Sequence, residues 1–128
     1  MKVMLGAWIA ANDADGNRHE VEVVIRLANE FPDIVVAVSV GNETQVYWSA
    51  HKSPEQNLVE YIRMVRAGVK QPVTTADDYN FWNKPESHAI ADEVDFLVLD
   101  SSHAHSKGVL DAATRLRQAF PEVKIIAV

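Results

Sequence analysis

Short apolar runs alternate with amphipathic segments along the whole 128-residue chain. The runs lie at residues 3–9, 34–40, 72–75, 94–99 and 123–128. Runs of this length, rich in β-branched residues, are typical of parallel strands that are buried on both faces. They predict five parallel strands in the order of the chain.

Amphipathic segments separate these runs and predict four helices. They lie at residues 18–30, after Ser53-Pro54, at residues 86–92 and at residues 106–120. Each of the longer segments has one face expected to turn to the core. The residues on these faces are Val21, Val24, Ile25 and Ala28 in the first segment, Leu58, Tyr61, Ile62 and Val65 in the second, and Val109, Leu110, Ala113, Leu116 and Phe120 in the last. The resulting order, βαβαβαβαβ, predicts a single α/β domain over residues 1–128.

Two arrangements of such a sheet remain open. Strands in barrel order would form part of a (β/α)₈ barrel with all helices on one face. The barrel-interior face would then meet water, which favours self-association or a complementary barrel fragment. A doubly wound, flavodoxin-like order, 2-1-3-4-5, would cover both faces and suits a monomer. The pattern slightly favours the doubly wound sheet.

Composition narrows the classes of function. With 48% hydrophobic and 23% charged residues, the chain is typical of soluble globular proteins. A net charge of −6 argues against nucleic-acid and anionic-membrane partners, and no apolar run approaches the ~20 residues of a membrane span. There is no cysteine, which excludes disulfides and thiolate metal sites and fits a cytoplasmic protein.

One motif carries candidate chemistry, the segment Gly41-Asn42-Glu43 at the end of the second apolar run. The carboxyl ends of parallel strands are where α/β folds bind ligands. A Glu there can protonate a glycosidic oxygen, and the preceding Asn can bind a sugar hydroxyl. A polar loop that caps the next helix explains the same residues equally well.

Residues 3 to about 98 resemble the family 17 glycoside hydrolases, which are β-1,3-glucanase-like. The resemblance is carried by residues 3–9, 31–43 and 69–79. It implies a (β/α)₈ barrel that hydrolyses β-glucans with retention. In that frame Glu43 matches the acid/base and Asn42 its sugar-binding neighbour.

The resemblance also implies substrate-binding residues and a second carboxylate. Asp78, Tyr79 and Trp82 would bind the sugar. Trp8 is a further candidate for stacking on a ring, with core packing as its alternative role. The family's nucleophile is a second Glu at the end of the seventh strand, and this sequence ends at Val128 inside that strand, so the Glu has no counterpart here. Asp77 and Asp78, expected in a loop after the third strand, do not match that position, and a solvated loop or a helix cap is favoured for them.

The last thirty residues carry a different resemblance. Residues 95–110 and 120–127 are similar to the inosine monophosphate dehydrogenase family, also (β/α)₈ barrels. The resemblance implies that Asp100 and Ser101 lie on the cofactor side. Ala104 stands where that loop commonly has a glycine, and the phosphate loop and catalytic cysteine loop have no counterpart. A structural segment without a cofactor is therefore expected, with weak nucleotide binding at Asp100–Ser106 as the alternative.

A metal site is not predicted. His103 and His105 could share an ion, but no third ligand stands at a suitable spacing. An exposed or capping histidine pair is the expected role.

The two resemblances meet near residues 94–100 and together suggest a chimera. The leading hypothesis is an engineered barrel-fragment protein without evolved activity, residues 1–95 being glucanase-like and 96–128 dehydrogenase-like. The alternative is a retaining β-glucan hydrolase-type domain with Glu43 as acid/base, completed by another chain.

Overall fold

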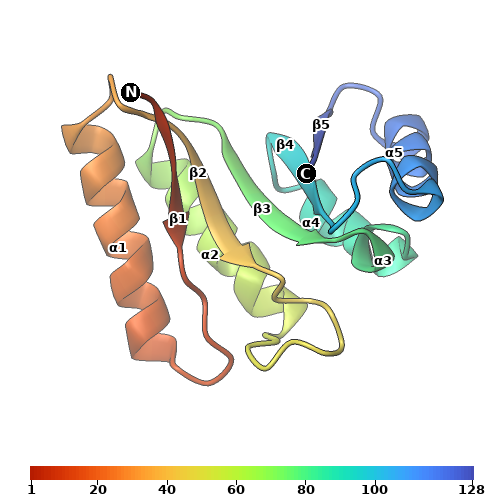
Figure 1. Cartoon of the computed structure of the whole chain (residues 1–128). Coiled ribbons are helices and arrows are strands. Elements are labelled where there is room, and N and C mark those ends of the chain that lie inside the picture. Colours follow the sequence, from red (N-terminus) through yellow and green to blue (C-terminus); the bar gives the residue numbers. More distant parts are fainter.

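Five parallel strands lie side by side in the order in which they occur in the chain (Figure 1). The computed structural model describes residues 1–128. Its strands are β1 (Val3–Ala7), β2 (Val35–Asn42), β3 (Val73–Asp78), β4 (Phe96–Asp100) and β5 (Lys124–Ala127). Its helices are α1 (Ala14–Glu30), α2 (Glu55–Gly68), α3 (Tyr79–Trp82), α4 (His88–Ala91) and α5 (Lys107–Ala119), with a 3₁₀ turn, η1 (Pro85–Ser87), before α4.

This strand order decides between the two expected arrangements. The order β1-β2-β3-β4-β5 is that of consecutive units of a (β/α)₈ barrel, so the preference for a doubly wound order was wrong. A right-handed crossover that always steps in the same direction places every helix on the same face. A doubly wound sheet needs a reversal of direction, and no crossover reverses here.

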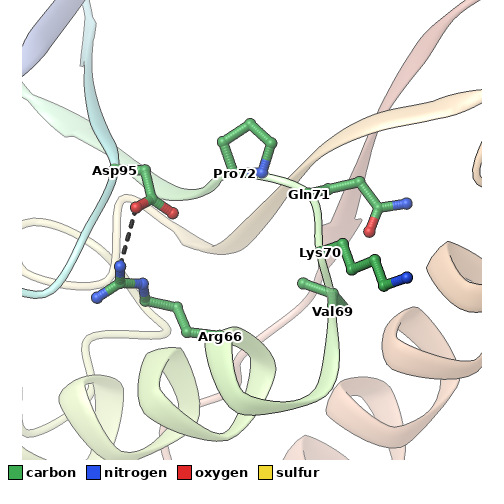
Figure 2. Close-up of a pocket in the computed structure, with 6 residues that line it drawn as sticks. All are labelled: Arg66, Val69, Lys70, Gln71, Pro72 and Asp95. Carbon is green, nitrogen blue, oxygen red and sulfur yellow. Dashed lines mark hydrogen bonds and ion pairs between the residues drawn. The ribbon is translucent and has the colours of Figure 1, made fainter.

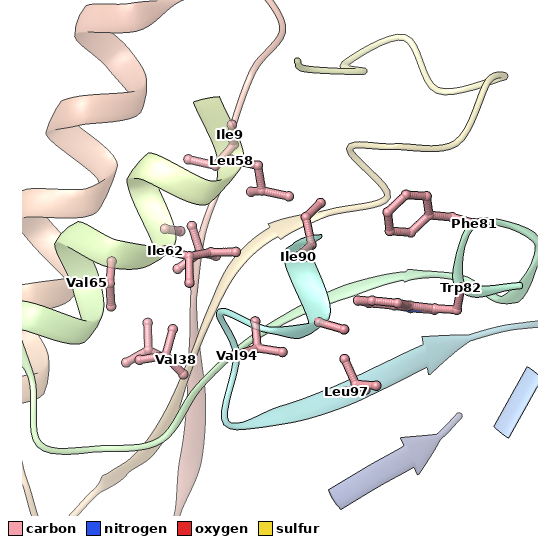
Figure 3. Packing of buried hydrophobic residues seen from close by; sticks show 14 of the residues in the cluster. Ile9, Val38, Leu58, Ile62, Val65, Phe81, Trp82, Ile90, Val94 and Leu97 are labelled. Atoms are coloured by element: carbon pink, nitrogen blue, oxygen red, sulfur yellow. The ribbon is translucent and has the colours of Figure 1, made fainter. Parts of the chain in front are cut away.

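The core lies between the sheet and the helices (Figure 3). It contains 23 buried residues, most of them from the helices and from the strand positions that face them, with Ile9, Val46 and Val94 added from loops. The buried helix positions follow the predicted faces, among them Val21, Val24 and Ala28 of α1 and Leu58, Ile62 and Val65 of α2. In α5 the buried residues are Val109, Ala112 and Leu116. The prediction for Leu110 was wrong: it is 55% exposed, because Ala112 takes the place on the face turned to the sheet.

The opposite face of the sheet carries a smaller apolar cluster. Ala37, Ala76, Phe96 and Val98 are buried there, and no helix packs over them. Apolar side chains at the two edge strands stay largely exposed, namely Met4, Trp8, Ile126 and Val128. This is the exposed interior face that the barrel arrangement predicts.

The third strand is longer than predicted. It continues through Asp77 and Asp78, which pair with Leu99 and Asp100 of β4, so the expectation that both acids lie in a following loop was wrong. The apolar run ends at Thr75, but hydrogen bonds to two neighbouring strands extend the β conformation beyond it.

A fifth helix, α3, follows directly and was not predicted. It is a four-residue helix whose N-cap is Asp78, and the Asp78 carboxylate accepts the Asn80 N–H at 2.7 Å. The capping role expected for these acids is thus met by Asp78. None of the helices has the length and apolar character that crossing a membrane would require.

Candidate active site at the carboxyl edge of the sheet

Strand β2 leaves the sheet through two residues with left-handed backbone angles. Gly41 has φ 76°, and Glu43 has φ 51°, the single non-glycine residue with positive φ. A Cβ at Gly41 would lie 2.9 Å from Thr44 Cγ2 and 3.2 Å from Leu58 Cδ1, so only glycine fits the turn. The Glu43 N–H donates to the Ala76 carbonyl at 2.9 Å, which keeps Glu43 against β3.

Three acids gather at this edge. Asp78 of β3 and Asp100 of β4 stand opposite each other, and both interact with Glu43. Burial raises the pKa of Glu43, and the negative charges of Asp100 and Asp78 raise it further, against a smaller lowering by His51. The structure therefore brings Glu43 and Asp100, which lie far apart in the sequence, to the same edge of the sheet.

Asp77 points to the opposite face from Asp78 and is fully buried. Its Oδ2 accepts the Gln45 N–H at 3.0 Å, and its Oδ1 accepts the Asp78 N–H at 2.8 Å. Burial raises the pKa of Asp77 to about 7 despite these two hydrogen bonds, and the charges of Glu43 and Asp78 act in the same direction. A buried acid of this kind is typical of functional sites.

His51 and Trp8 also lie at this edge, in contact with each other. The Gly41-Asn42-Glu43 motif did not predict this contact. His51 Nε2 donates to the Asn42 carbonyl at 2.7 Å, and its ring lies 4.6 Å from the Trp8 ring. Trp8 is 53% exposed, so core packing does not explain it. His51 comes from the loop between β2 and α2, where no periodicity marks a contact with β1, and sequence reasoning therefore missed it.

The remaining predicted sugar-binding aromatics differ in their placement. Tyr79 is half-buried and packs on Gly108 at the start of α5, where a Cβ would lie 2.5 Å from Tyr79 Cε2. Trp82 is 1% exposed, and its indole N–H donates to the carbonyls of Asp77 and Val98. Stacking of Trp82 on a sugar is therefore corrected to a role in the core.

Two hollows lie at the same edge. One, of about 280 Å³, is lined on β1 and β2 by residues that include Trp8 and Asn42. The other, of about 310 Å³, is lined by Asp78, Tyr79 and Ser101 together with neighbouring polar residues. Asn42 is half-buried, and its side chain makes no hydrogen bond within the chain.

A hollow at the opposite edge has a structural explanation (Figure 2). Its Arg66 guanidinium pairs with Asp95 Oδ1 at 2.9 Å, and Asp95 Oδ2 accepts the Val73 N–H at 2.8 Å. These contacts tie α2 to the starts of β3 and β4. They engage both oxygens of the Asp95 carboxylate in contacts that hold the fold together.

The histidine pair makes no metal site in this structure. The rings of His103 and His105 lie 6.0 Å apart, and both residues are exposed. No group of three or more His, Cys, Asp or Glu side chains is arranged to hold a metal ion.

Comparison with known proteins gives two separate likenesses, and no family model matches the chain. One likeness is to a probable glucan endo-1,3-β-glucosidase of Emericella nidulans, with 24% identity. It covers 98% of this chain and 31% of that protein. A stretch of 34 residues, 27% of the chain, is 50% identical to 7% of an inosine-5′-monophosphate dehydrogenase of Bacillus subtilis.

Solved structures agree with the first likeness. An endo-laminarinase from Formosa superposes with a TM-score of 0.70 and 26% identity, over 79% of this chain and 33% of that one. An endo-β1,6-glucanase superposes with a TM-score of 0.59 and 12% identity, over 97% of this chain and 31% of that one, which shows the fold alone. The chain thus has the α/β arrangement of glycoside hydrolase-type (β/α)₈ barrels and spans about a third of the relatives that it matches over most of its length.

Proposed function

We propose that the chain forms the proton-donor side of a glycoside hydrolase site for β-glucans, with Glu43 as the acid/base. The observation that carries this proposal is the cluster of Glu43 with Asp78 and Asp100 at the carboxyl edge of the sheet. Burial and the two neighbouring charges raise the pKa of Glu43, which keeps it protonated to higher pH. A general acid that donates a proton to a leaving sugar needs such a raised pKa.

The surroundings of Glu43 suit a carbohydrate. Trp8 is half exposed beside Asn42, so an aromatic face and an amide are available to one sugar unit. Tyr79 lines the second hollow with Asp78. The glucan-hydrolase names of the sequence relative and of the endo-laminarinase support β-glucan as the substrate class.

A complete retaining site needs a second carboxylate ~5 Å from the first. Asp78 and Asp100 act on Glu43 as charges, and Asp78 is committed to capping α3. We therefore assign the nucleophile to a complementary barrel segment that covers the exposed face of the sheet. Size-exclusion chromatography with light scattering would detect self-association as one form of this complement.

Hydrolysis of laminari-oligosaccharides by the associated form of the chain, in which the sheet face is covered, tests the proposal. Glu43→Gln is expected to reduce product formation ~100-fold or more, because it removes the transferable proton, and to leave oligosaccharide binding nearly unchanged. Glu86→Gln, at an exposed acid of η1, is the matched control. Equal rates for wild type and Glu43→Gln would refute the role of Glu43.

A second candidate is a chimera of two barrel segments without evolved activity. The observation that favours it is the 34-residue match to an unrelated dehydrogenase at twice the identity of the glucanase match. Calorimetry with laminari-oligosaccharides and with NAD separates the candidates. No heat with either ligand would support the chimera, whereas heat with NAD would support the alternative of nucleotide binding. We expect none with NAD, since Asp78 and Asp100 would repel its phosphates.

A further inference from the structure

The loop between Glu43 and α2 is closed at its base. The Ser53 N–H donates to the Thr44 carbonyl at 2.9 Å, and Gln45 Nε2 donates to the Ser53 carbonyl at 3.0 Å. Tyr47 and Trp48 at its tip are exposed. The loop is therefore a compact unit, and its position relative to the sheet depends on what holds its base.

Consecutive residues of β3 hold that base. The Ala76 carbonyl accepts the Glu43 N–H at 2.9 Å, and Asp77 Oδ2 accepts the Gln45 N–H at 3.0 Å. The remaining Asp77 oxygen accepts the Asp78 N–H at 2.8 Å, which orients the carboxyl group. The short segment from Glu43 to Gln45 is thus fixed to β3 at both of its ends.

This arrangement explains the backbone of Glu43. A non-glycine residue with φ 51° is in a sparsely populated conformation that persists only where its surroundings impose it. The bond from Ala76 fixes the amide before Glu43, and the bond from Asp77 fixes the amide two residues later. Releasing the second bond would let Glu43 relax to an ordinary backbone conformation and move its carboxyl group.

We propose that Asp77 is a positioning residue for Glu43, holding the loop that sets the direction of the Glu43 side chain. The catalytic meaning of this role rests on the proposed function, whereas the contact itself does not. Asp77 is fully buried and is not expected to touch substrate. Burying a carboxyl group is unfavourable. Its role in holding the loop explains why Asp77 is buried nonetheless.

Amide hydrogen exchange tests the contact. In the wild type the Gln45 amide is expected to exchange much more slowly than the Trp48 amide at the exposed tip. In Asp77→Ala it is expected to exchange ~10-fold faster, with the Val38 amide in β2 unchanged. Asp77→Asn keeps one acceptor oxygen, so a smaller effect shared between the amides of Gln45 and Asp78 is expected.

Asp95→Asn is the matched control. Asp95 also accepts a backbone N–H, that of Val73, but at the opposite edge of the sheet. This variant is expected to leave the Gln45 amide unchanged. The proposal would be overturned by an unprotected Gln45 amide in the wild type, by no acceleration in Asp77→Ala, or by equal acceleration of all amides. The wild-type measurement does not depend on whether a variant folds.

Kinetics separate this inference from the proposed function. If the wild type hydrolyses laminari-oligosaccharides, Asp77→Ala is expected to lower kcat ~10-fold or more with KM nearly unchanged, because the loss falls on the transition state. Hydrolysis with an unchanged kcat would refute the positioning role alone. No heat on calorimetric titration with laminari-oligosaccharides, together with the expected exchange at Gln45, would refute the proposed function and leave Asp77 as the anchor of the loop.

Discussion

Asp78 and Asp100 stand directly opposite each other on β3 and β4, where both strands reach the carboxyl edge of the sheet. Opposed like charges on neighbouring strands are unfavourable. Both also act on Glu43 and raise its pKa. The electrostatics of the site therefore depend on a contact between the two segments with different resemblances.

Asp100→Asn is expected to lower the pKa of Glu43, because it removes the larger of the two repulsive charges acting on that carboxyl group. A carboxyl ¹³C NMR titration measures the change. Asp92→Asn, at the exposed C-cap of α4, is the control and is expected to leave that pKa where it is. A Glu43 titration that is the same in wild type and Asp100→Asn would contradict the three-acid cluster.

Stability is expected to fall as pH rises from about 4 to about 7. Asp77 holds its proton more tightly in the folded chain, with a pKa of about 7 against an ordinary 3.8, so the folded state binds more protons in this range. This stabilisation, up to roughly 4 kcal/mol, is fully present below the ordinary pKa and is lost as the pH rises through the folded-state pKa. Urea denaturation across this range measures it, and Asp77→Asn is expected to flatten the curve. An unchanged slope in the variant would assign the pH dependence to other groups.

Trp82→Phe is expected to destabilise the chain by about 1–3 kcal/mol, because the carbonyls of Asp77 and Val98 lose a shared buried donor. Chemical denaturation measures the loss. Trp48→Phe, at a residue 54% exposed, is the matched control with an expected change within about 0.5 kcal/mol. Equal effects of the two substitutions would show that the indole N–H of Trp82 contributes nothing.

Gly41→Ala is expected to cost about 2 kcal/mol, from the positive φ and from the close approach to Thr44 and Leu58. Thermal or urea denaturation tests it. Gly6→Ala is the control, because a Cβ there meets no atom within 4 Å, and a change within about 0.5 kcal/mol is expected. Tolerance of alanine at Gly41 would mean that the turn before Glu43 adapts readily.

The sequence predicted the strands and the buried faces of α1 and α2 because apolar periodicity records burial directly. It did not predict the strand order, since the same runs suit a barrel order and a doubly wound one. The extension of β3 to Asp77 and Asp78 was not predicted. Pairing with β4 keeps these polar residues in the strand, and the sequence has no apolar run there. The four residues of α3 are too few to show a helical period.

The candidate site was predicted in part. Asn42 and Glu43 lie at the expected edge, and their roles remain predictions. Trp82 was misjudged because an aromatic residue next to a polar segment has the same pattern whether it faces solvent or the core. The contact of His51 with Asn42 spans a loop whose path depends on hydrogen bonds at its base, and sequence spacing does not record such bonds.

The consecutive strand order has a further consequence, for how the chain is built. Each strand pairs only with strands adjacent in sequence, so a newly synthesised unit finds its docking edge already formed by the preceding unit. No strand waits for a distant partner, which keeps loop-closure costs low at every step. The same property lets a terminal unit be exchanged for a foreign one, provided that one strand pairing and the helix packing beside it, such as that of Tyr79 on Gly108, are compatible at the junction.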